Sequence, residues 1–355
     1  MSRLDEIKKF YKGKKVLVTG HTGFKGSWLA FWLNSMGADV LGIDHKFGDK
    51  DGIYEQTDIM HDITSASYDI LNYGNLLYLF NSFQPELVFH LAAQPIVRES
   101  YDNPKLTFET NTQGTINVLE CIRNTKSVKS AVMITTDKVY DNKEWIWGYR
   151  ENDKLGGSDP YSASKACAEL AIKSYYDSFF KLSGVNIASV RAGNVIGGGD
   201  WAKDRIMVDI IKSIKKGNVL EVRSPNSTRP FQHVLEPLWG YLLVGKDLFD
   251  SKIKFENYNF GPDQSHVISV KELVTKIQAM SDLKWIDKSN PNNSKKESVL
   301  LSLDSTKAKN DLGWEGKLSI DETLRITLLW YQQLNEQVSM DRFTKFQIEE
   351  YEDLL

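Results

Sequence analysis

Short apolar runs and amphipathic stretches alternate along the first half of the chain. The apolar runs predict buried strands at residues 15–19, 39–43, 86–91, 130–135 and 186–191. Apolar residues recur at helical spacing in residues 28–36, 106–123 and 161–182. Apolar strands that alternate with helices are typical of a parallel sheet covered on both faces. The pattern therefore predicts an α/β fold, a Rossmann-type doubly wound parallel sheet with a smaller α/β substrate-binding domain.

The alternation stops after residue 191, where residues 197–201 (G-G-G-D-W) are followed by short charged helices. A chain of 355 residues is also too long for one small core. We expect a Rossmann domain of residues 1–190 plus roughly 233–262. The second domain would hold residues 191–232 plus roughly 263–355. The final stretch, residues 340–355, is acidic and amphipathic; it predicts a terminal helix on the body or on a partner subunit, or a frayed tail.

A glycine-rich segment joins the first predicted strand to the first predicted helix, and a second strand then ends at Asp44. Glycines allow a tight turn and close approach to a pyrophosphate, which a helix N-terminus stabilises. The segment predicts a dinucleotide site that includes Gly20, Thr22, Gly23, Phe24, Lys25 and Gly26. Asp44 can accept a hydrogen bond from an adenosine ribose, which favours NAD over NADP. His45 and Lys46 weaken that preference, and Asp44 could instead cap a loop.

Tyr161 and Lys165 are four residues apart at the start of a predicted helix. Asp159 can cap this helix and Pro160 suits its first position. Residues at this spacing share one helix face. A cation beside a phenol lowers the phenol's pKa from about 10 towards neutrality, which makes a general acid or base. An exposed helix face would show the same spacing.

Candidate site residues follow three of the predicted strands. The segments that follow strand ends are Ala92-Ala93, Thr136-Asp137-Lys138 and Arg191-Ala192-Gly193-Asn194. Ligands of open α/β sheets bind outside the carboxyl ends of the strands. We therefore expect these groups to meet at one edge of the sheet.

Composition excludes several classes of function. Apolar residues make up 41% and charged residues 26% of the chain, as in an ordinary globular protein. The net charge of -3 gives no reason to expect a nucleic-acid or membrane partner. Because there is no signal-peptide pattern or bilayer-length apolar run, we expect a cytoplasmic protein. Cys121 and Cys167 read as reduced core residues, and the six histidines lack metal-ligand spacing, so we expect no metal site.

These motifs together resemble the extended short-chain dehydrogenase/reductase family over essentially the whole chain. The residues that carry the resemblance are the glycine segment, Leu91-Ala92-Ala93, Asn111, Thr136 and the pair Tyr161 and Lys165. Longer blocks are similar to the nucleotide-sugar 4,6-dehydratases that act on CDP-glucose. These blocks are residues 20–28, 90–95, 147–151, 191–201 and 229–234. Neighbouring nucleotide-sugar dehydratases share many of them.

The resemblance implies an NAD-dependent dehydration of CDP-glucose for deoxysugar and surface-polysaccharide synthesis. The sugar would be oxidised at C4, lose water across C5 and C6, and regain a hydride at C6. Thr136, Tyr161 and Lys165 match the Ser/Thr-Tyr-Lys triad of the family. Asp137 would protonate the leaving O6, and either Lys138 or Tyr161 would remove the C5 proton. A solvated surface pair is the other interpretation of Asp137 and Lys138.

The resemblance also implies binding residues. For the cofactor it adds Asp62, Ile63, Leu91, Ala92, Ala93, Tyr161 and Lys165. For the substrate it gives Gln94, Asn194, Asp204, Arg205 and Arg229; Arg205 could instead be a helix-face charge and Arg229 part of a turn ion pair. Lys296-Glu297 departs from the family's usual His-Glu.

The resemblance further implies a homodimer or homotetramer. A dehydratase or epimerase of a GDP-, UDP- or dTDP-hexose is an alternative function. A non-catalytic NAD-binding regulator is another, but such proteins usually lose the tyrosine or the lysine.

Overall fold

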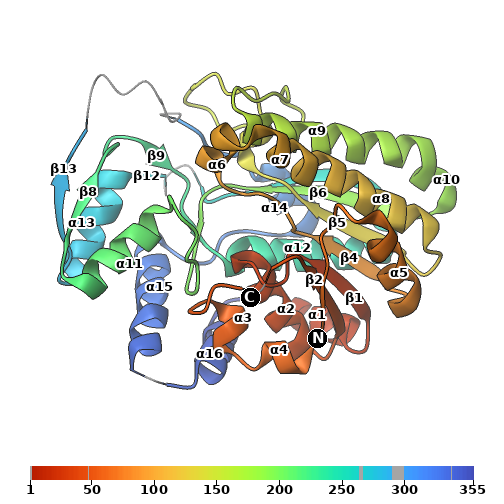
Figure 1. Cartoon of the computed structure of the whole chain (residues 1–355), viewed down its shortest axis with the longest axis horizontal. Helices are drawn as coiled ribbons and strands as arrows, with labels where there is room; N and C mark the ends of the chain where they lie inside the picture. The colour runs from red at the N-terminus through yellow and green to blue at the C-terminus, as the bar shows by residue number, and fades with distance from the viewer. Residues whose placement is uncertain (1, 47, 264–266, 290–299, 337) are drawn as a thin grey trace.

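Seven parallel strands form the central sheet of the computed structural model, which describes residues 2–46, 48–263, 267–289, 300–336 and 338–355 (Figure 1). The order across the sheet is β11-β6-β5-β4-β1-β2-β3. The strands are β1 Lys15–Thr19, β2 Asp39–Asp44, β3 Thr64–Ser67, β4 Leu87–His90, β5 Ser130–Ile134, β6 Asn186–Ala192 and β11 Phe255–Phe260. The order reverses between β1 and β4, which creates the switch point where such sheets bind ligands. The predicted Rossmann-type sheet is confirmed.

Helices cover both faces of the sheet (Figure 1). On one face lie α5 Tyr73–Phe83, α8 Gly114–Asn124 and α9 Pro160–Tyr175; on the other lie α1 Arg3–Tyr11, α2 Phe24–Ser35 and α12 Leu235–Phe249. Successive strand residues point to opposite faces, so Val16 and Val18 join one core while Leu17 joins the other. The strands are therefore apolar throughout because both of their faces are buried.

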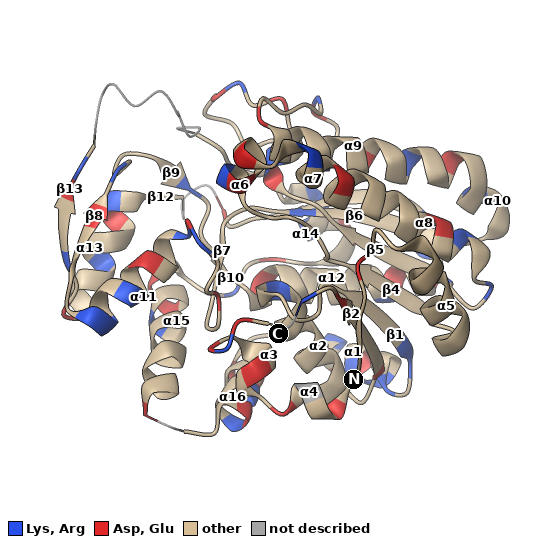
Figure 2. Ribbon diagram, viewed as in Figure 1, with Lys and Arg blue, Asp and Glu red and all other residues tan. Residues whose placement is uncertain are grey.

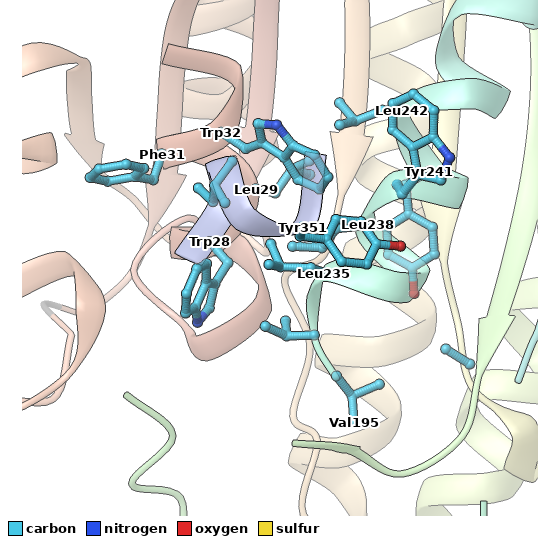
Figure 3. Packing of buried hydrophobic residues seen from close by; sticks show 14 of the residues in the cluster. Trp28, Leu29, Phe31, Trp32, Val195, Leu235, Leu238, Tyr241, Leu242 and Tyr351 are labelled. Atoms are coloured by element: carbon cyan, nitrogen blue, oxygen red, sulfur yellow. The ribbon is translucent and has the colours of Figure 1, made fainter. Parts of the chain in front are cut away.

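The larger of the two cores is built around tryptophans. Figure 3 shows Trp28 and Trp32 of α2 beside Leu235 and Leu238 of α12. Tyr351 reaches the same core from the C-terminal helix, with its ring edge-on to Trp32 at 5.9 Å. Side chains of this size bury the most apolar area, so α2 and α12 are fixed relative to the sheet.

Several helices differ from their predicted bounds. α2 begins at Phe24 because Gly23 is its N-cap, so the last residues of the glycine segment form its first turn. The predicted helix 106–123 starts earlier, as α7 Pro104–Phe108, and passes through a π-helical turn, Glu109–Gln113, before α8. α9 starts at Pro160, where the Asp159 carboxylate accepts from the Ser162 amide at 2.9 Å. It continues through a π-helical turn, Tyr176–Phe180, into α10 Lys181–Ser183.

A second region lies beyond the carboxyl ends of the strands, which we call the small region (Figure 1). It contains the pairs β8–β13 and β9–β12, with the helices α11 Ile206–Lys216 and α13 Val270–Met280. Its strands are β8 Val219–Val222, β9 Thr228–Arg229, β12 Ile268–Ser269 and β13 Lys284–Asp287. A further pair, β7 Val195–Ile196 with β10 Gln232–His233, connects this region to the sheet body.

The short helices that remain connect the main elements. They are α3 Ile53–Gln56, α4 Ile59–Asp62, α6 Val97–Asp102, α14 Thr306–Leu312 and the 3-10 turn Asp137–Val139. α14 packs on α12 and β11, although the predicted division assigns residues 263–355 to the substrate-binding domain.

The last two helices are α15 Ile320–Asn335 and α16 Met340–Glu352. α16 packs on α2 and α3 of the sheet body. Its Glu352 carboxylate accepts from Lys8 Nζ at 2.7 Å and from Trp32 Nε1 at 2.9 Å. Of the three possibilities for this stretch, a helix on the body is the correct one. No helix in the described ranges is long and apolar enough to cross a membrane.

Candidate active site

The backbone is closely packed where the glycine segment turns between β1 and α2. Gly20 has φ +76°, and a Cβ there would lie 2.7 Å from the Ala92 amide nitrogen. A Cβ on Gly26 would lie 1.9 Å from the Gly20 carbonyl oxygen. Only glycine fits at these two positions, and the first turn of α2 is thereby brought against the end of β1. A close turn that exposes a helix N-terminus has the shape that a dinucleotide pyrophosphate requires.

Asp44 ends β2 beside this turn. Its carboxylate accepts from Thr22 Oγ1 at 2.8 Å and from the His45 amide at 2.8 Å. Burial raises the pKa of Asp44, but the hydrogen bonds from His45 and Thr22 outweigh burial and leave the pKa below its ordinary value. The His45 ring also contacts Asp44 at 3.2 Å. Asp44 is therefore an ionised acceptor at the carboxyl edge of the sheet, where an adenosine ribose can be bound.

The structure does not bring Asp62 and Ile63 to this edge. Asp62 ends α4 and Ile63 precedes β3, so both lie at the opposite edge of the parallel sheet. Asp69 and Ile70 instead follow β3, and the Tyr68 amide donates to the Asp44 carbonyl at 2.9 Å. The cofactor assignment of Asp62 and Ile63 is thus not supported, and Asp69 and Ile70 occupy the equivalent place at the correct edge. Three Asp-Ile pairs occur in residues 58–70, and β3 itself is too polar to be recognised.

Tyr161 and Lys165 lie on one buried face of α9. Their side chains are 7% and 5% exposed, so the alternative of an exposed helix face is wrong. Lys165 Nζ donates to the Ile134 carbonyl at the end of β5, at 3.3 Å. The same helix face carries Glu169 one turn further on. α9 therefore points a phenol, an ammonium and a carboxylate at the ends of β5 and β6.

Glu169 holds the catalytic helix to the sheet. Its two carboxylate oxygens accept from Arg191 Nε and Nη2, both at 2.8 Å. They also accept from Thr135 Oγ1 at 2.5 Å and from Ser189 Oγ at 2.7 Å. Burial raises the pKa of Glu169, but Arg191 and these hydroxyls outweigh it and hold the pKa below its ordinary value. A bidentate ion pair with all its partners buried gives this helix one defined position.

The pKa of Tyr161 differs from the predicted one. Burial raises it to about 12, although a hydrogen bond with Thr136 and the charge of Arg205 partly oppose the rise. Burial likewise lowers the pKa of Lys165 to about 8, with Glu169 opposing. The predicted lowering of the Tyr161 pKa is therefore wrong for the protein without its ligands. Desolvation by burial outweighs the opposing effects of Thr136 and Arg205. Both shifts show that the two groups lie in a dry environment.

Thr136, Asp137 and Lys138 follow β5 and lie beside Tyr161. Thr136 Oγ1 donates to Asp137 Oδ1 at 2.9 Å, and Lys138 Nζ lies 3.5 Å from the same oxygen. Asp137 is 1% exposed, and its Oδ2 has no hydrogen-bond partner in the described chain. A Cβ on Gly193 would lie 3.3 Å from Oδ2, so this oxygen faces the end of β6. Asp137 is not part of a solvated surface pair, and its free oxygen is available to a ligand.

Further cations gather beside this acid. Burial lowers the pKa of Lys25 to about 7, and the charges of Arg205, Lys165 and Lys138 lower it too, whereas Asp137 raises it. Lys25, from the first turn of α2, therefore lies near Asp137, Lys138 and Lys165 as well as beside the predicted cofactor site. Arg205 precedes α11, and its Nε is buried without a partner in the described chain.

The other predicted substrate residues have different surroundings. Gln94 donates to Thr107 Oγ1 of α7 at 2.9 Å and accepts from the Ile96 amide of its own loop at 2.5 Å. Arg229 donates to the Thr228 carbonyl at 2.7 Å. Asn194 follows β6 and accepts the Gln232 amide at its backbone carbonyl. Gln94 therefore stabilises the loop after β4. Lys296-Glu297 lies outside the described residues.

Asn111 connects this loop to the catalytic helix. Its side chain is fully buried, donates to Ser164 Oγ at 2.9 Å and accepts from the Gln94 amide at 2.8 Å. Sequence reasoning gave Asn111 no role and missed Glu169 altogether. The spacing of Glu169, four residues after Lys165, was the available signal. In the described ranges, no group of three or more His, Cys, Asp or Glu side chains is arranged to hold a metal ion.

Comparison with known proteins agrees with this geometry. The family model described as GDP-mannose 4,6 dehydratase matches residues 17–327. A CDP-glucose 4,6-dehydratase of Salmonella typhimurium is 44% identical over 333 residues, which cover 92% of this chain and 92% of that protein. The chain belongs to the NAD-dependent nucleotide-sugar dehydratase and epimerase family, a branch of the extended short-chain dehydrogenase/reductases.

A more distant relative and two solved structures are also similar to this chain. A CDP-paratose 2-epimerase of Salmonella typhi is 25% identical and covers 89% of this chain and 98% of its own length. A UDP-glucose 4-epimerase from Stenotrophomonas maltophila, solved with bound NAD and formylated UDP-arabinopyranose, has a TM-score of 0.81 at 20% identity, covering 92% and 100%. A UDP-glucose 4-epimerase from Thermotoga maritima, solved with UDP-glucose, has a TM-score of 0.78 at 22% identity, covering 90% and 98%.

Replacing Glu169 tests how much the buried ion pair stabilises the protein. Glu169→Gln leaves the Arg191 charge buried without its counter-ion, so the free energy of unfolding should fall by about 3–5 kcal/mol. Urea unfolding followed by circular dichroism measures the change. Asp177→Asn is the matched control, because Asp177 pairs at 2.6 Å with Lys173 on the exposed side of the same helical stretch. It should change the free energy of unfolding by less than about 0.5 kcal/mol. Equal effects in the two variants would contradict the role given to Glu169.

Proposed function

We propose that the protein removes water from CDP-D-glucose to form CDP-4-dehydro-6-deoxy-D-glucose. The observation that carries the proposal is the buried Asp137, which lies between Thr136 and Lys138 with one free oxygen beside Tyr161. Oxidation at C4 needs only the threonine, tyrosine and lysine, whereas elimination also needs an acid for the leaving group. CDP-glucose is favoured because the 44% identical relative bears the name of that activity.

Oxidation at C4 makes the elimination possible. The C5 proton of an ordinary hexose is not acidic, but a ketone at C4 acidifies it. Bound NAD would supply the acceptor for the hydride from C4 and the source of the hydride that the sugar regains at C6. Tyr161 would take the O4 proton, and Thr136 would bind O4 and orient it. Lys165 would hold positive charge beside the phenol, which the raised pKa of Tyr161 makes necessary.

Elimination would then fall to the residues after β5. Asp137 would give its proton to O6 as the hydroxyl leaves, because its free Oδ2 is buried at the end of β6, beside Tyr161. Lys138, half-buried beside it, would remove the C5 proton, with Tyr161 as the other candidate base. Lys138 Nζ lies 3.5 Å from Asp137 Oδ1, so the two groups are close enough to act on neighbouring atoms of one sugar.

We assign NAD to the glycine segment and the neighbouring strand ends. Gly20, Gly23 and Gly26 would allow the pyrophosphate to approach, and Thr22, Phe24 and Lys25 would line the turn. Asp44 would accept from the adenosine ribose, and Leu91, Ala92 and Ala93 would line the site at the end of β4. The hydrogen-bonded, ionised Asp44 supports NAD over NADP, since it would repel a 2′-phosphate.

A homodimer or homotetramer remains our proposal for the assembly. Large apolar side chains are exposed on α6, α7, α9 and the π-helical turn that follows α9. These are Tyr101, Leu106, Phe108, Leu170 and Phe179. Exposed apolar side chains can be covered when subunits associate. The division into a Rossmann and a substrate-binding domain, the cytoplasmic location and a role in surface-polysaccharide synthesis also stay proposals.

The substrate is tested by turnover on a nucleotide panel. The NAD-loaded protein is incubated with CDP-, GDP-, UDP- and dTDP-glucose, and mass spectrometry follows the loss of one water. We expect loss of water from CDP-glucose in preference to the other three. Dehydration of another member of the panel with CDP-glucose unchanged would identify a different dehydratase. Epimerisation without loss of water would contradict the dehydratase proposal.

Tyr161→Phe removes only the oxygen that accepts the O4 proton. The rate of dehydration should fall by about 10²–10⁴-fold, while the thermal unfolding temperature stays near that of the wild type. Tyr175→Phe is the control, because Tyr175 ends the same helix and donates to Glu120 instead. Near-normal turnover by Tyr161→Phe would mean that another group takes the proton.

Asp137→Asn separates oxidation from elimination. The amide keeps the shape of the side chain but cannot deliver a proton, so loss of water should fall by about 10²–10⁴-fold. The ketone at C4 should still form on a sugar that keeps O6. Reduction of the reaction mixture with borodeuteride and mass spectrometry would detect deuterium at C4 of that sugar.

The control for this experiment is Asp141→Asn, a nearby carboxylate that pairs with Lys143 and Lys154 at the surface. It should dehydrate CDP-glucose as the wild type does. Lys138→Met should abolish exchange of the C5 proton with solvent deuterium if Lys138 is the base; if exchange persists, Tyr161 is the better candidate. Unchanged dehydration in both Asp137→Asn and Lys138→Met would contradict our assignment of the elimination step.

A further inference from the structure

An ion pair joins the sheet body to the small region. Arg98 lies on α6, which follows β4, and Asp204 lies in the loop before α11. Figure 2 shows charged residues of both signs on α6 and on α11. Arg98 Nη1 is 2.6 Å from Asp204 Oδ1, and Arg223 Nη2, just after β8, is 3.9 Å from the same oxygen. The Arg98 and Asp204 side chains are 40% and 35% exposed, so the pair is only partly screened by water. The Asp204 carboxylate thus contacts one guanidinium from the sheet body, that of Arg98, and one from the small region, that of Arg223.

The Arg98 end of this pair is fixed to the catalytic helix. Gln94 donates to the Ile96 carbonyl and accepts its amide, and Ile96 is the N-cap of α6. Asn111 bonds to the Gln94 backbone and also donates to Ser164 Oγ on α9. α6 is therefore held through buried side chains to the helix that carries Tyr161 and Lys165.

At the other end of the pair, the backbone conformation of Asp204 determines the direction in which the chain continues into Arg205. Asp204 has φ +60°, a left-handed conformation that a non-glycine residue keeps only when its surroundings hold it there. Arg205 follows, with its Nε buried and without a partner in the described chain. The charge of Arg205 lowers the pKa values of both Tyr161 and Lys25. Its guanidinium thus lies among the catalytic residues and has donor capacity left for a ligand.

We propose that Arg98 is a positioning residue, which holds Asp204 so that Arg205 faces the diphosphate or sugar of the substrate. The inference rests on the proposed function, because it takes a nucleotide sugar as the ligand. Asp204, predicted as a substrate contact, then acts through Arg205. An arginine aimed in this way presents a planar fork of donors to phosphate or sugar oxygens.

A double-mutant cycle on the NAD-loaded protein tests the proposal. Arg98→Gln and Asp204→Asn each break the pair, so each should raise KM for CDP-glucose about fivefold and leave kcat nearly unchanged. The double variant should be no worse than Asp204→Asn alone, because Asp204→Asn already loses the contact with Arg98 together with the longer one with Arg223. Arg98→Lys, which keeps the charge, should recover part of the loss. The difference in KM between wild type and Arg98→Gln should shrink as salt is added, because salt screens the wild-type pair.

The matched control is Arg123→Gln. Arg123 pairs with Glu120 at 2.7 Å with side-chain exposures of 41% and 26%, which resemble those of the Arg98 pair. It lies on α8, away from the small region, and its loss should leave KM unchanged.

Three outcomes would overturn the proposal. An unchanged KM in both single variants would mean that the ion pair has no influence on the substrate. Increases that multiply in the double variant would mean that Arg98 and Asp204 act separately. A fall in thermal stability with kcat and KM affected alike would indicate a purely structural pair. Failure of the proposed function is distinguishable, because the wild type itself would then not dehydrate CDP-glucose; the cycle is repeated with whichever nucleotide sugar of the panel it does convert.

Discussion

The buried ion pair between Glu169 and Arg191 is the constraint on which the site depends. Moving two charges out of water is unfavourable, and the pair is tolerable only because every carboxylate oxygen and the guanidinium are bonded. Arg191 continues the network to Tyr140, whose hydroxyl donates to Asn259 at 2.7 Å. The catalytic helix, two central strands and the edge strand β11 are thereby joined through polar contacts that admit one arrangement.

That arrangement explains how reactive groups can be held close together in a dry environment. Tyr161 and Lys165 both lie on α9, and the bonds of Glu169 to Arg191, Thr135 and Ser189 hold this helix against the ends of β5 and β6. The strongest charges acting on Lys25 are three cations, Arg205, Lys165 and Lys138, with one carboxylate, Asp137. This excess of positive charge favours an anionic ligand such as a diphosphate. The negative charge of such a ligand would thus balance the excess of positive charge around Lys25.

Much of the fold could be predicted from the sequence, because it rests on local patterns. The five apolar runs all became strands of the sheet, and Asp159-Pro160 fixed the start of α9. β3 was not predictable, because its sequence, T-S-A-S, has no apolar run. Without β3 the sequence does not show which Asp-Ile pair follows a strand, and the predicted pair, Asp62-Ile63, lies at the wrong edge of the sheet. The raised pKa of Tyr161 was equally out of reach, because it depends on burial rather than on the neighbouring lysine. Gln94 and Asp204 were recognised as important residues, but what they bond to depends on segments far away in the chain.

The contact between Trp32 and Glu352 has a consequence for how the protein is made. Trp32 belongs to the second helix of the chain, and its indole nitrogen donates to a carboxylate in the last turn of the final helix. A ribosome completes and releases the N-terminal strands and helices well before that turn exists. The core around Trp32 therefore stays incomplete until residue 352 has been synthesised, and a chain cut before α16 would hold the proposed catalytic residues yet lack the helix that packs on α2.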